Sequence, residues 1–113
     1  MSEFGLEDLA AIIATRAGAT AEASYTKSLL DGGPRRAAKK MGEEAIETVI
    51  AAIDGDREAL VCESADLLYH LLVVLHQKGI TLADVYAELE HRTGRSGYAE
   101  KAARQADAAA IED

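Results

Sequence analysis

A single short turn constrains how this chain can fold, because Asp54-Gly55-Asp56 separates two long segments with helical patterning. In both segments, residues 35–54 and residues 57–78, aliphatic side chains recur at the three- and four-residue intervals of an amphipathic helix. Glycine commonly ends a helix and aspartate commonly caps the start of the next one. The sequence therefore predicts an all-α fold, a helical bundle built on a long antiparallel helix pair.

The rest of the chain also favours helices. Aromatic residues make up only 4% of the sequence and hydrophobic residues 49%, which suits helices better than a β-sandwich. We expect one domain, residues 1–97, and an Ala-rich tail, residues 98–113, that forms a frayed or partner-dependent helix. Within the domain, the expected shorter elements are a helix from Leu6 to Gly18, a helix from Ala21 to Leu30, a helix from Thr81 to about His91 and a loop at 92–97.

Two pairs of acidic residues stand symmetrically about Gly55. Glu44 and Glu47 lie three residues apart before the turn, and Glu63 and Asp66 lie three residues apart after it. Residues at this spacing share one side of a helix. An antiparallel helix pair would therefore place Glu47 beside Glu63. Glu44 would lie beside Asp66, one helical turn further away from Gly55.

The acids also lie close to apolar stripes. On the second long helix, Glu63 is at the edge of a stripe that contains Leu67 and Val74. A carboxylate in such a place loses solvation, which is costly unless something compensates. Few basic side chains stand at helical spacing from these acids, and carboxylate oxygens suit hard cations. We therefore predict a magnesium site, with manganese as the substitute, and four ligands: Glu44, Glu47, Glu63 and Asp66.

Basic residues near the acids suggest a phosphate ligand. Lys39 and Lys40 precede Glu44 by about one turn, and Arg95 belongs to a second basic element near Gly94. An isolated lysine pair is usually solvated, so this interpretation depends on the neighbouring acids. His70 is placed either to bind metal or substrate, or to pack inside the protein and steady an acid.

Charge and cysteine content restrict the partners and the compartment. The net charge of −8 argues against nucleic acids and anionic membranes as partners. The one cysteine, Cys62, excludes an internal disulfide and fits a reducing cytoplasm. We expect no signal peptide, because no basic segment followed by an apolar stretch opens the sequence. The most apolar run, Leu71–Leu75, is too short to span a bilayer. We expect a cytoplasmic protein.

The acid motif, Glu-x-x-Glu, fifteen residues, then Glu-x-x-Asp, resembles the signature of the MazG-like all-α nucleotide pyrophosphohydrolases. Two further stretches, Ser24–Leu30 and Ala65–His70, are similar to the phosphoribosyl-ATP pyrophosphatase family of that superfamily. The resemblance extends over about residues 4–92.

This resemblance implies a hydrolase that converts phosphoribosyl-ATP and water to phosphoribosyl-AMP and pyrophosphate, the second step of histidine biosynthesis. It implies magnesium at the four acids, and an attacking water that is either bound to the metal or oriented by Glu43 or Glu47. Lys39, Lys40, Arg95 and His70 are the candidate substrate contacts. The family is typically homodimeric, which agrees with the second long helix being apolar nearly all round.

Three other functions compete with this interpretation. A house-cleaning pyrophosphohydrolase for non-canonical nucleotides shares the acid motif but would need an aromatic residue to stack on the base, and the chain has no Trp and a single Phe, Phe4. A ferritin-like di-iron bundle requires Glu-x-x-His motifs, whereas Ile50 and Asp66 follow Glu47 and Glu63 by three residues. A non-catalytic helical dimer is the third.

Overall fold

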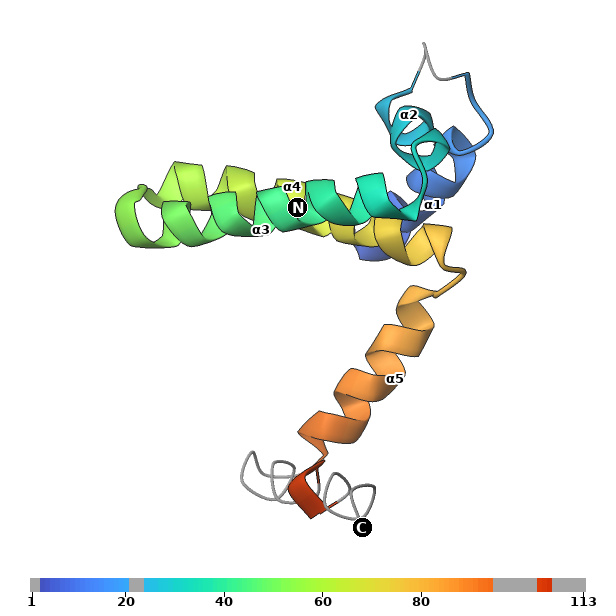
Figure 1. Cartoon of the computed structure of the whole chain (residues 1–113). Helices are drawn as coiled ribbons and strands as arrows, with labels where there is room; N and C mark the ends of the chain where they lie inside the picture. Colours follow the sequence, from blue (N-terminus) through green and yellow to red (C-terminus); the bar gives the residue numbers. More distant parts are fainter. Residues whose placement is uncertain (1–2, 21–23, 95–103, 107–113) are drawn as a thin grey trace. The chain divides into compact units, whose positions relative to one another are not determined.

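The computed structural model describes residues 3–20, 24–94 and 104–106, and every regular element in these residues is helical. In chain order the helices are α1 (Leu6–Arg16), α2 (Tyr25–Asp31), α3 (Pro34–Asp54), α4 (Arg57–Gln77) and α5 (Leu82–Thr93) (Figure 1). The prediction of an all-α fold is confirmed. The chain forms two compact units, Met1–Thr81 with α1 to α4 and Leu82–Asp113 with α5.

The long helices α3 and α4 run antiparallel, side by side, as the sequence predicts (Figure 1). The turn between them requires glycine, because a Cβ atom on Gly55 would lie only 2.7 Å from the carbonyl oxygen of Ala51. The Asp56 carboxylate caps α4 by accepting a hydrogen bond from the Ala59 N–H at 2.8 Å. Gly55 and Asp56 therefore set the symmetry point about which the two acid pairs are arranged.

The two short helices cover the end of the pair that is far from the turn. α1 packs against α4, and α2 packs against both long helices. Ile13 of α1, Leu29 of α2 and Val73 of α4 are fully buried there. α2 begins at Tyr25 rather than at the predicted Ala21, because the Ser24 hydroxyl caps it by accepting a hydrogen bond from the Lys27 N–H.

The aliphatic stripe of α3 is left largely exposed in the single chain. The residues of α3 that are buried are small, Ala37 and Ala51, whereas the stripe residues are 51–75% exposed: Ile46, Val49, Ile50 and Ile53. α4 exposes large apolar side chains as well, namely Leu60, Val61, Leu68 and Leu71. The acid-bearing side of α3 thus lies toward α4, and both helices keep an apolar face free in the single chain.

α4 also meets the length and hydropathy criteria for a membrane span, although its most apolar run alone is too short. Core helices of soluble proteins pass the same test, so this is weak evidence. Glu63 and Asp66 lie in the middle of the helix, where carboxylates would be costly in a bilayer.

In the second unit, α5 continues through Thr93, so the predicted loop begins two residues too early. Arg92 pairs with Glu88 one turn earlier at 2.9 Å, and the Thr93 hydroxyl donates to the Leu89 carbonyl at 2.8 Å. Both contacts favour helical conformation at Arg92 and Thr93. The predicted domain boundary at residue 97 lies outside the described residues, and of the predicted tail only 104–106 are described, in helical conformation.

Candidate active site

The antiparallel pair brings acids from both long helices together. One carboxylate oxygen each from Glu44, Glu63 and Asp66 lie within 4.8 Å of one another. Glu47 is not part of this three-residue cluster, but it lines a cavity of about 270 Å³ together with Glu63. The four predicted ligands therefore occupy one region between α3 and α4.

Electrostatics tie the four acids into one group. The pKa of the Glu63 carboxyl is raised, first by desolvation and then by the negative charges of Asp66, Glu47 and Glu44. Glu63 is partly buried, and its charged form is disfavoured by three like charges. A bound cation would relieve both effects.

The predicted basic residues lie next to the acids along α3. Lys40 Nζ is 3.2 Å from the carboxylate of Glu43. The pKa of Lys40 is raised, chiefly by its hydrogen bond to Glu43 and next by its charge–charge interaction with Tyr25. Lys39 is exposed. The structure thus places Glu43, a predicted catalytic residue, in an ion pair with Lys40.

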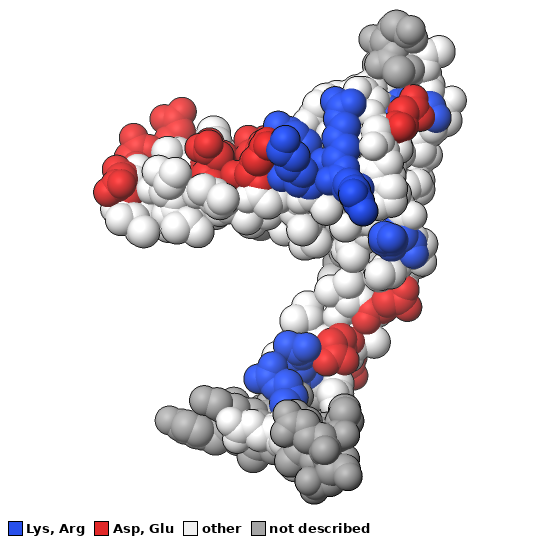
Figure 2. All heavy atoms as spheres, in the orientation of Figure 1, with Lys and Arg blue, Asp and Glu red and all other residues white. Residues whose placement is uncertain are grey.

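The order of charges along α3 is opposite to the one that stabilises a helix. The first two turns of α3 carry four basic residues, and the acids follow them: Arg35, Arg36, Lys39 and Lys40 come before Glu43, Glu44 and Glu47. Figure 2 shows the resulting basic patch directly beside the acidic one. The helix macrodipole prefers acids at the amino end and bases at the carboxyl end. The interaction with the macrodipole therefore does not explain this arrangement.

His70 is buried, at 6% exposed, and both of its ring nitrogens have protein partners. The Nδ1–H donates to the Asp66 carbonyl at 2.7 Å, because a carbonyl oxygen can only accept. Nε2 then accepts from the Tyr25 hydroxyl at 3.1 Å. The packed histidine considered as an alternative in the sequence is the arrangement found, and its role in substrate binding stays a prediction.

Two residues near the site were given no role by sequence reasoning. Tyr25 reaches from α2 to His70, although its ring is about half exposed. The Thr48 hydroxyl contacts the backbones of both long helices. In the sequence, Thr48 could have been noticed as a β-branched hydroxyl residue inside a predicted helix, directly after an acid. Such a hydroxyl can hydrogen-bond to backbone carbonyls.

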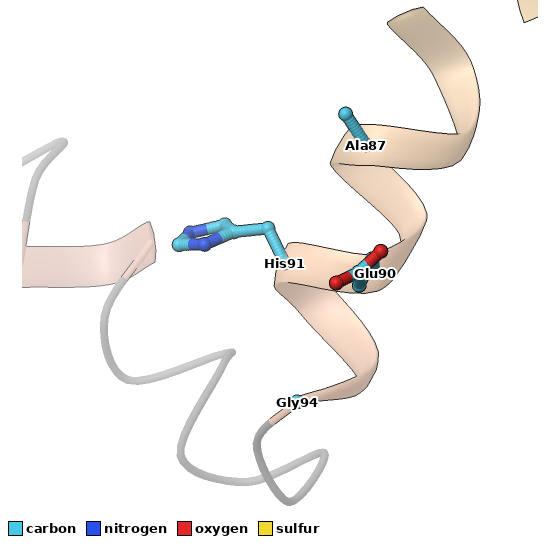
Figure 3. Close-up of a pocket in the computed structure, with 4 residues that line it drawn as sticks. All are labelled: Ala87, Glu90, His91 and Gly94. Atoms are coloured by element: carbon cyan, nitrogen blue, oxygen red, sulfur yellow. The ribbon is translucent and has the colours of Figure 1, made fainter. Parts of the chain in front are cut away.

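The remaining candidate, Arg95, lies outside the described residues. A different cavity, of about 430 Å³, lies on the α5 unit and is lined by Ala87, Glu90, His91 and Gly94 (Figure 3). Figure 3 shows the Glu90 and His91 side chains leaving the helix in different directions. None of the predicted site residues that the structure describes lines this cavity, so the acid cluster is the better candidate for a catalytic centre.

Comparison with known proteins points to the same chemistry. The family model described as phosphoribosyl-ATP pyrophosphohydrolase matches residues 6–93. The phosphoribosyl-ATP pyrophosphatase of Agrobacterium fabrum is 61% identical over 104 residues, which are 92% of this chain and 97% of the relative. The enzyme of the same name from Sinorhizobium medicae is 60% identical over 105 residues, 93% of this chain and 98% of the relative.

The family match and the alignments with these two relatives all span the four acids, the basic residues of α3 and the buried His70. This chain therefore belongs to the phosphoribosyl-ATP pyrophosphohydrolase family of hydrolases.

Proposed function

We propose that this protein hydrolyses phosphoribosyl-ATP to phosphoribosyl-AMP and pyrophosphate, in histidine biosynthesis, with a bound Mg²⁺. The names of its relatives support the substrate. The observation that supports the chemistry is the convergence of Glu44, Glu63 and Asp66 within 4.8 Å, beside the basic half of α3.

The donor set fits a magnesium ion. All of the clustered donor atoms are carboxylate oxygens, which favour Mg²⁺ or Mn²⁺ over softer metals. Glu44, Glu63 and Asp66 would hold the ion, and Glu47, which the sequence predicts as a fourth ligand, stands outside their cluster. When bound, such an ion offsets the charge of phosphate oxygens and makes a water molecule more acidic.

The chain's own residues then have distinct roles. Lys39 and Lys40 would bind the triphosphate oxygens, and Glu43 would hold the Lys40 ammonium in place by the ion pair already described. Glu47 is the candidate to accept the proton of the attacking water, because its carboxylate stands outside the three-residue cluster yet shares a cavity with Glu63. As the new phosphorus–oxygen bond forms, the α–β anhydride bond breaks, and the products are phosphoribosyl-AMP and pyrophosphate. Arg95 and His70 remain further candidates for substrate binding.

We propose further that the protein works in the cytoplasm as a homodimer, without a membrane or nucleic-acid partner. Exposed aliphatic side chains on both α3 and α4 would be costly to leave in water, and a second copy of the helix pair would cover them. The net charge of −8 disfavours polyanionic partners.

Turnover measurements with a panel of substrates test this function. After chelation, we expect the protein to be inactive, and added Mg²⁺ should restore hydrolysis of phosphoribosyl-ATP. The kcat/KM for phosphoribosyl-ATP should exceed that for ATP or deoxynucleotides by about 100-fold or more. ATP and deoxynucleotides lack the phosphoribosyl group and therefore cannot make the contacts that this group makes. A preference for deoxynucleotides would instead indicate a house-cleaning enzyme, and full activity without metal would refute the magnesium assignment.

A further inference from the structure

The Thr48 side chain connects the two helices that carry the acids. Its Oγ1 lies 2.8 Å from the carbonyl oxygen of Glu44 in the same helix and 3.1 Å from the carbonyl oxygen of Glu63 in α4. The hydroxyl has a single hydrogen to donate, so the two carbonyls share it. Thr48 is partly buried, which limits competition from water.

Both acceptors belong to residues of the acid cluster. Glu44 and Glu63 are two of the three residues whose carboxylates converge. A threonine in a helix often bonds the carbonyl four residues earlier, as Thr15 does to Ala11 at 3.0 Å in α1. The bond from Thr48 to Glu63 is different, because it joins α3 to α4 at the level of a cluster residue.

The acids themselves work against this contact between the helices. Glu44 and Glu47 on α3 face Glu63 and Asp66 on α4, and like charges at this distance repel. Mg²⁺ demands nearly ideal octahedral geometry, so a small increase in helix spacing would weaken its binding. Groups that orient metal ligands without touching the metal typically change affinity by about 10- to 100-fold.

We propose that Thr48 is a positioning residue, whose cross-helix hydrogen bond holds α3 and α4 at the spacing that Glu44, Glu63 and Asp66 need to bind a divalent cation. This inference rests on the proposed metal-dependent function. Thr48 touches neither substrate nor metal in this role.

Three variants separate this role from simple helix stability. Thr48→Val keeps the side-chain shape but removes the hydroxyl, Thr48→Ser keeps the hydroxyl, and Thr15→Val removes a comparable bond that does not cross between helices. Binding is measured by calorimetric titration of the metal-free proteins with Mg²⁺, and independently by the decrease of the free Mn²⁺ signal in electron paramagnetic resonance. Thermal unfolding and the Mg²⁺ dependence of phosphoribosyl-ATP hydrolysis are recorded in parallel.

We expect Thr48→Val to weaken Mg²⁺ and Mn²⁺ binding by about tenfold. Its kcat at saturating Mg²⁺ should stay within about twofold of the wild-type value, since no group that acts on substrate is lost. Thr48→Ser and Thr15→Val should bind the metals like the wild type. If Thr48→Val lowers thermal stability but binds Mg²⁺ as tightly as the wild type, Thr48 is only structural and the inference is wrong.

A second outcome would also overturn the inference. If Thr48→Ser and Thr48→Val weaken Mg²⁺ binding equally, loss of the hydroxyl is not the cause of the weaker binding. The thermal unfolding of each variant shows whether it is folded before its metal binding is compared. Absence of Mg²⁺ binding by the wild-type protein is a separate result, visible before any variant is compared. It would refute the proposed metal-dependent function and this inference with it.

Discussion

Replacement of Glu63 by Gln, or of Asp66 by Asn, is expected to abolish hydrolysis of phosphoribosyl-ATP while leaving the helices intact. The amide keeps the size and shape of the side chain but no longer offers an anionic oxygen from the three-residue cluster. We expect kcat/KM to fall by at least about 1,000-fold, because a metal ion supplies several kcal/mol of transition-state stabilisation. Steady-state kinetics at saturating Mg²⁺, with circular dichroism as the check on folding, measure this loss.

The Glu63→Gln substitution should not destabilise the metal-free protein. Glu63 carries a desolvated charge beside three other acids, which raises its pKa, so the neutral Gln removes an unfavourable interaction. Without metal, Glu63→Gln should therefore unfold at the same temperature as the wild type or at a higher one. With Mg²⁺ the order should reverse, because only the wild type gains the binding free energy.

Glu58→Gln is the matched control for these variants. Glu58 is an exposed acid in the first turn of the same helix, outside the cluster. It undergoes the same chemical change, and we expect wild-type kinetics and a wild-type response to Mg²⁺. Unaltered activity in Glu63→Gln or Asp66→Asn would contradict their assignment as ligands.

Ile53→Asp is expected to convert the proposed homodimer to monomers. Ile53 is 75% exposed on the apolar face of α3, the largest exposure of the four aliphatic residues there. Burying an unpaired carboxylate in an apolar interface costs about 3 kcal/mol or more, which corresponds to at least about a 100-fold higher dissociation constant. Sedimentation over a dilution series measures this constant, and the thermal stability of the variant should fall with it.

Ala11→Asp adds the same charge at an exposed position of α1, which carries none of the exposed aliphatic face, and should leave the proposed dimer unchanged. Two results would go against the proposed dimer. One is a wild-type protein that stays monomeric at all concentrations, and the other is an Ile53→Asp variant that associates as tightly as the wild type.

The antiparallel pair could be predicted because its signals are local. A turn that needs Gly55, an Asp56 cap and two periodic segments are all readable within about fifty residues. Once the turn is known, the positions of the acids about it follow from helix geometry alone. This is why sequence reasoning brought Glu44, Glu63 and Asp66 together, although their role as metal ligands stays a prediction.

The face of α3 that meets α4 could not be read in the same way. An apolar stripe predicts that a helix is covered, but not which element covers it. In this chain small residues, Ala37 and Ala51, pack inside and the larger aliphatic side chains stay exposed. The environment of His70 depends likewise on Tyr25, which α2 brings from 45 positions away in the sequence.

A crystal structure of the protein soaked with Mn²⁺ tests the central claim most directly, since the anomalous signal of manganese locates the ion without reference to activity. We predict an anomalous peak between α3 and α4, with carboxylate oxygens of Glu44, Glu63 and Asp66 at coordination distance. Crystals that show no peak there at saturating Mn²⁺, or a peak only at other residues, would contradict the account.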